Sequence, residues 1–78
     1  MKTEKEIKHL KGFCEIAGDT QIIHILEYVL KNLDSVTLLI NQIEDSINSK
    51  ERLRIGHELI YIKDLPRVKN VLEWIMEE

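Results

Sequence analysis

Residues 22–30 read IIHILEYVL, and residues 68–76 read VKNVLEWIM. The two stretches align with a constant offset, 72 − 26 = 46, which places Leu26 on Leu72 and Tyr28 on Trp74. In both, apolar residues recur at spacings of three and four, the pattern of an amphipathic helix. Each stretch therefore predicts a helix with one buried face, and the rest of the chain is interpreted around this pair.

The correspondence continues upstream without a gap. Thr3 aligns with Ser49, and Ile7 aligns with Leu53. This predicts an internal duplication of one helical hairpin, over about 3–32 and about 49–78. Only three aligned pairs are identical: Ile16 with Ile62, Leu26 with Leu72, and Glu27 with Glu73. Convergence of two unrelated amphipathic hairpins therefore remains an alternative.

The apolar spacing predicts helices over about 3–17, 20–32, 36–47, 50–63 and 66–77. Thr3 and Glu6 form a capping-box pattern, and Gly18-Asp19 suits the end of one helix and the start of the next. Pro66 is tolerated only in a first turn, so it indicates a helix start. The pattern leaves open whether 36–47 and 50–63 form one continuous helix.

A chain of 78 residues is expected to form a single domain, and it contains few glycines and prolines for tight turns. The predicted fold class is all-α, with four to five short helices arranged as two similar antiparallel hairpins joined by a central helix. A chain this short has a thin core, so oligomerisation or partner binding is a natural source of extra stability.

Two large aromatic side chains fall outside the predicted apolar stripes. Trp74 lies well off the stripe of Val68, Leu72 and Ile75, and Tyr28 holds the equivalent place in the first copy. Such rings either pack against the other hairpin or lie in an interface, where aromatic residues dominate binding energy. The candidate interface residues are Tyr28, Trp74 and the similarly displaced Phe13 and Leu59.

The sequence favours no catalytic or metal chemistry. His9, His24 and His57 lack the spacing of a metal site, and the glycines are too isolated for a phosphate-binding loop. Cys14 lies on a predicted core stripe and is interpreted as a structural residue. We therefore expect no enzyme activity, no cofactor and no small-molecule substrate.

Charge, hydropathy and cysteine content limit the classes of partner and the cellular location that we expect. The net charge of −3 argues against general binding to nucleic acid, which requires a clustered basic surface. No apolar run approaches the length of a membrane span, and no signal peptide is recognised. A single cysteine cannot form an intramolecular disulfide, so the expected location is the cytoplasm.

One short motif has a known counterpart. Asn32-Leu33-Asp34-Ser35-Val36 resembles the Asp-Ser-Leu signature of acyl and peptidyl carrier proteins. That resemblance implies a phosphopantetheine arm on Ser35, at the start of a helix. The chain departs from the family pattern, because a strong helical pattern precedes the motif and Val36 replaces the leucine. Asp-Ser before an apolar run is also an ordinary helix cap.

These observations favour a small cytoplasmic interaction module, such as an adaptor, an inhibitor or a regulatory subunit. It would act by burying an apolar helical face on a protein partner or on a second copy of itself. The alternatives are a carrier protein modified on Ser35 and a small DNA-binding regulator.

Overall fold

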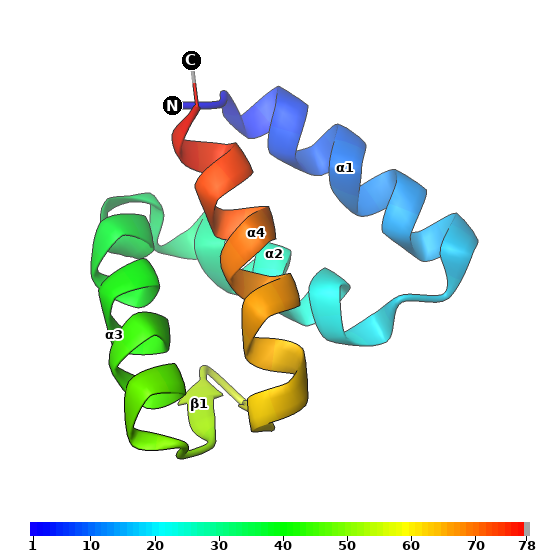
Figure 1. Cartoon of the computed structure of the whole chain (residues 1–78). Coiled ribbons are helices and arrows are strands. Elements are labelled where there is room, and N and C mark those ends of the chain that lie inside the picture. The colour runs from blue at the N-terminus through cyan, green and yellow to red at the C-terminus, as the bar shows by residue number, and fades with distance from the viewer. Residues whose placement is uncertain (78) are drawn as a thin grey trace.

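The computed structural model describes residues 1–77 and consists mainly of helices, as Figure 1 shows. The elements are α1 (Glu4–Ala17), α2 (Thr20–Lys31), the 3-10 turn η1 (Leu33–Ser35), α3 (Val36–Ser49), β1 (Leu53–Ile55), β2 (Glu58–Ile60), the 3-10 turn η2 (Ile62–Asp64) and α4 (Leu65–Met76). The all-α class predicted from the sequence is confirmed, since 75% of the chain is helical.

The helix ends follow local sequence signals. The Glu6 backbone N–H donates to Thr3 Oγ1 over 3.2 Å, and the Thr3 N–H donates to Glu6 Oε1 over 3.2 Å, which completes the predicted capping box. Gly18 ends α1 in the left-handed conformation with φ +73°, and Asp19 caps α2. Pro66 lies in the first turn of α4, where its missing N–H costs no helical hydrogen bond.

Residues 50–63 do not form a helix, so the predicted helix there and the second helical hairpin over 49–78 are wrong. α3 ends at Ser49, and Lys50 adopts the left-handed conformation that terminates it. The strands β1 and β2 then pair antiparallel, with Leu53 opposite Ile60 and Ile55 opposite Glu58. The alternating burial of Leu53, Arg54 and Ile55 is the two-residue period of a strand.

The turn of this β-hairpin depends on Gly56. Its φ of +60° is a conformation that favours glycine, and Gly at the first of two turn residues is typical of a II′ hairpin. The turn also lies directly against the ring of Tyr28, because a Cβ on Gly56 would be only 2.8 Å from Tyr28 Cδ2. Gly56 thus permits a close approach of the hairpin to α2.

One apolar cluster forms the core, and every helix and both strands contribute to it. Its fully or almost fully buried members are Ile7, Ile22, Ile25, Leu26, Val29, Val36, Leu39, Ile43, Ile55, Ile60, Leu65, Val68, Leu72 and Ile75. The positions aligned between α2 and α4 have matching burial: Leu26 with Leu72 and Val29 with Ile75 are all inside. The duplicated pattern therefore has the same structural meaning in these two helices, while the duplication itself stays a prediction.

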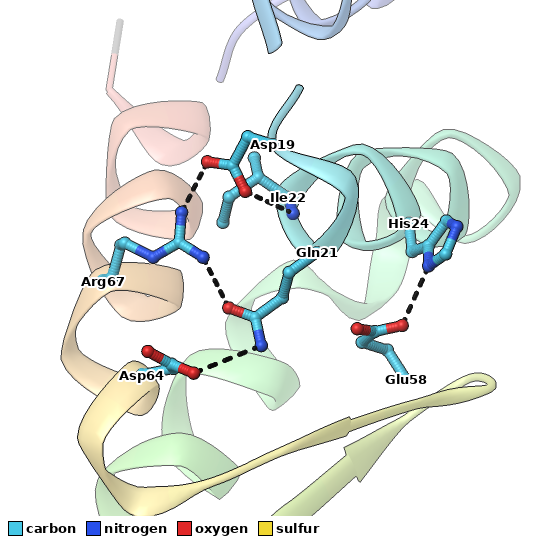
Figure 2. Close-up of polar contacts among 7 residues, drawn as sticks. All are labelled: Asp19, Gln21, Ile22, His24, Glu58, Asp64 and Arg67. Carbon is cyan, nitrogen blue, oxygen red and sulfur yellow. Dashed lines mark hydrogen bonds and ion pairs between the residues drawn. The ribbon is translucent and has the colours of Figure 1, made fainter. Parts of the chain in front are cut away.

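A polar network joins the first turns of α2 and α4, as Figure 2 shows. The Arg67 guanidinium donates to Asp19 Oδ2 and, over 2.6 Å, to Gln21 Oε1. Gln21 Nε2 reaches Asp64 Oδ2 at 3.5 Å. Because Asp19 also accepts the Ile22 N–H as the cap of α2, one carboxylate orients both helices.

None of the helices in residues 1–77 is long and apolar enough to cross a membrane.

Replacing Gly56 by Ala should lower the free energy of unfolding by about 1–3 kcal/mol, because alanine is strained at positive φ and its methyl would collide with Tyr28. The matched control is Gly12→Ala, in the middle of α1 with open space around it. That control should raise the free energy of unfolding by about 0.5–1 kcal/mol, since alanine is the better helix former. Urea denaturation of both variants provides the measurement, and equal effects of the two would contradict this account of the turn.

Candidate protein interface

The structure brings together two of the four candidate interface residues. Phe13 of α1 and Trp74 of α4 line one groove of about 260 Å³. The remaining lining residues, Glu6, His9 and Leu10, all come from α1. We call this surface the α1–α4 groove. It is mostly apolar and aromatic, with one carboxylate at its edge.

The two ends of the chain position this groove. The Lys2 backbone N–H donates to the carbonyl oxygen of Ile75 over 2.7 Å. This bond fixes the start of α1 beside the end of α4, and Figure 1 shows the beginning of the chain next to the last turn of α4. Trp74 is therefore brought against the first two turns of α1.

The aromatic rings of the groove have different environments. Trp74 is half-buried and packs against the core, and the Lys2 ammonium lies 5.2 Å from its ring centroid. Phe13 is 63% exposed and stacks on the His9 ring, with centroids 5.6 Å apart and planes 8° from parallel. Trp74 forms a fixed wall of the groove, and Phe13 presents a free apolar face to solvent.

Ile16 extends the exposed apolar surface of α1 and was not among the predicted site residues. It is 87% exposed, the highest value of any large apolar side chain in residues 1–77. A sequence signal for it existed: nine positions after Ile7, at about 100° per residue, Ile16 falls on the opposite side of the helix. Its counterpart in the sequence alignment of the two halves, Ile62, is also exposed, at 43%.

Charge is distributed unevenly around the groove. Hydrogen bonds from the Thr3 backbone N–H and, secondarily, from the Thr3 hydroxyl lower the pKa of the Glu6 carboxyl. Glu6 is therefore ionised at neutral pH and places a negative charge at the edge of the groove. The Lys2 ammonium places a positive charge above Trp74. A partner with complementary charges on either side of an apolar contact fits this arrangement.

The other two candidate residues lie elsewhere. The Tyr28 ring is half-buried between the core and the turn at Gly56. Leu59 is half-buried on β2, opposite Arg54, and is directed to the outer face of the hairpin. Neither of them lines the α1–α4 groove.

Ser35, the residue singled out by the carrier-protein resemblance, is the last residue of η1 and is half-buried. Its hydroxyl donates to the Asn32 carbonyl oxygen over 2.7 Å. The side chain makes no capping bond to α3. The hydroxyl thus stabilises the turn between α2 and α3.

A second hollow, of about 450 Å³, lies between α2 and the hairpin turn. His24 and His57 both line it, although they are distant in sequence. His24 Nδ1 is 2.8 Å from Glu58 Oε2, as Figure 2 shows. Within residues 1–77, no group of three or more His, Cys, Asp or Glu side chains is placed to hold a metal ion.

Comparison with known proteins identifies no relative of this chain. No protein-family model, no curated protein and no solved structure matches the chain.

Cys14 is the one thiol of the chain, and it is half-buried against the core rather than in the groove. Burial, and next the nearby Asp19 carboxylate, raise the pKa of this thiol above its ordinary value. A reactive cysteine needs the opposite shift, because the thiolate is the nucleophile.

Cys14 should therefore react with iodoacetamide at pH 8 several-fold more slowly in the native protein than in urea, since burial and a raised pKa both reduce the accessible thiolate. Mass spectrometry of quenched time points measures the two rates. Cys14→Ser provides the unlabelled control. A native rate equal to or above the rate in urea would show that the thiol is accessible and activated.

Proposed function

We propose that this protein is a protein–protein interaction module that binds through the α1–α4 groove and the adjoining exposed face of α1. The observation that carries the proposal is the exposure of Phe13 and Ile16 on α1, at 63% and 87%. Small adaptors, inhibitors and regulatory subunits act in this way, and the groove can receive a partner or a second copy of the chain. The cytoplasmic location expected from the sequence is part of the same proposal.

Burial energy supports the choice of these two residues. Fully burying a Phe or Ile side chain contributes about 1.5–3 kcal/mol each. In the free protein both side chains are mainly in contact with water, so most of this burial energy would be gained only on binding. Phe13 lines the groove together with Trp74, and tryptophan is among the residue types enriched at the few positions that dominate a protein interface.

The geometry of the groove favours a helical partner segment. On α1, the residues His9, Phe13 and Ile16 follow one another at spacings of four and three, so they lie along one face of the helix. An amphipathic helix with apolar residues at the same spacings can pack along such a face. An apolar side chain of that helix would contact Trp74 between the opposite charges of Glu6 and Lys2.

The proposal predicts that Phe13→Ser and Ile16→Ser, combined, abolish binding while the protein remains folded. Exposed residues change stability little, so the free energy of unfolding should move by about 0.5 kcal/mol or less per substitution. Binding is measured in two ways: light scattering after size exclusion reports self-association, and quantitative pull-down with mass spectrometry reports a near-stoichiometric partner.

Leu38→Ser is the matched control. Leu38 on α3 is 57% exposed and lies outside the α1–α4 groove, so this variant removes the same type of exposed side chain elsewhere. Retention of the assembly by Leu38→Ser and its loss in the α1 variant would support the proposal. A wild-type protein that forms neither an oligomer nor a stoichiometric complex would refute it, as would an α1 variant with unchanged binding.

A further inference from the structure

The β-hairpin collects cationic side chains that the predicted helix would have dispersed. Residues 50–63 contain four basic and two acidic side chains, a net charge of +2 in a chain whose total is −3. Side chains alternate between the two faces of a strand. Leu53, Ile55 and Ile60 are directed into the core, so Arg54 and its partner Leu59 are directed outward.

This outward surface, which we call the cationic face, comprises Lys50, Arg52, Arg54, Tyr61 and Lys63. All five are exposed, and the Tyr61 side chain is 53% exposed. A hollow of about 720 Å³ lies among Lys50, Glu51, Arg52, Tyr61, Ile62 and Lys63. Within residues 1–77, none of the four basic side chains forms an ion pair.

The two acids of the segment neutralise this face only in part. Glu58 is half-buried beside His24 of α2, on the inner side of the hairpin, as Figure 2 shows. Glu51 lines the hollow and is the one carboxylate among the residues that form it. The cationic face therefore keeps an excess of positive charge around an accessible aromatic ring.

We propose that the cationic face binds single-stranded nucleic acid, with Tyr61 stacking on a base and the basic side chains contacting the adjacent phosphates. Arg54 lies on β1 and Arg52 directly precedes this strand, and two positions of extended chain span about 7 Å. This separation suits successive phosphates of an extended single strand. An aromatic ring among cations is the combination by which proteins bind single strands without reading their sequence.

An acidic protein segment would satisfy the positive charges but would leave the Tyr61 ring without a stacking partner. Duplex DNA would offer phosphates but no free base face. A single strand uses both features of the surface, which is why it is favoured over the other two. The inference is independent of the α1–α4 groove, because the two surfaces share no residue.

The test is fluorescence anisotropy of a fluorescein-labelled oligothymidylate of about 20 nucleotides. Four phosphate contacts on a single strand give a slope of about −3 for log affinity against log salt, so affinity should fall about 50-fold between about 50 and 200 mM NaCl. Arg52→Gln with Arg54→Gln removes two contacts. It should lower affinity at least tenfold at low salt and bring the slope to about −1.4.

Two further variants separate stacking from charge. Tyr61→Ala should weaken binding about fivefold or more, whereas Tyr61→Phe keeps the ring and should bind like the wild type. Lys5→Gln with Lys8→Gln makes the same charge change on exposed positions of α1 and should alter affinity less than twofold. Circular dichroism confirms that each variant is folded.

Several outcomes would overturn the proposal. The first is the absence of binding at low salt, or binding whose affinity does not fall as the salt concentration rises. The second is equal loss of affinity in the α1 lysine variant and the hairpin arginine variant, which would indicate a non-specific charge effect. The third is tighter binding of a duplex, or of labelled polyglutamate, than of the single strand, which would identify a different ligand for the same face.

Discussion

The fold depends on one constraint: a single apolar core must be shielded from water by elements that each supply only a few buried residues. α2 and α4 contribute most of it, with Leu26 and Leu72 both completely buried. α1 contributes one fully buried residue, Ile7, and the hairpin contributes Ile55 and Ile60. Because the cluster is shared, neither α1 nor the hairpin is expected to be stable alone, and short strands in particular need a packed face. The way in which α1 and the hairpin are attached to α2 and α4 therefore determines where the α1–α4 groove and the cationic face lie.

The attachments of α1 and of the hairpin differ in kind. α1 is held at its start by the Lys2–Ile75 backbone bond and at its end by Asp19, which also contacts Arg67. Between these points one side of α1 faces solvent, so Phe13 and Ile16 remain exposed. The hairpin is held mainly by packing, since Ile55 and Ile60 are buried in the core and the Gly56 backbone lies on the Tyr28 ring. One polar contact, between Glu58 Oε2 and His24 Nδ1 at 2.8 Å, adds to it. Tyr28, a candidate interface residue in the sequence analysis, thus packs against the turn of the hairpin.

The sequence was informative where the signal was long and local. α2 and α4 are each twelve residues long and present one apolar stripe. Thr3, Gly18 and Asp19 mark helix ends through hydrogen bonds with neighbouring backbone groups. The helix predicted over 50–63 is wrong because strands of three residues carry almost no periodic signal. Leu53, Leu59 and Ile60 fit helical spacing loosely, and the deciding signal was the two-residue turn at Gly56-His57. The pairing of Phe13 with Trp74 could not be predicted, because periodicity identifies a face of a helix and not the element that it meets.

The correction at the hairpin also changes the meaning of the charge. As a sequence property, a net charge of −3 argued against nucleic acid, but the average conceals a separation: the segment 50–63 carries +2, and the rest of the chain carries −5. An anionic strand would therefore be attracted to the cationic face, while the rest of the chain carries a net negative charge. α4 begins beside the hairpin, as Figure 1 shows, and Trp74 near its other end lines the groove. The twelve residues of α4 span about 18 Å. That separation leaves room for a protein at one end and a single strand at the other, so the two proposed activities are compatible on one molecule.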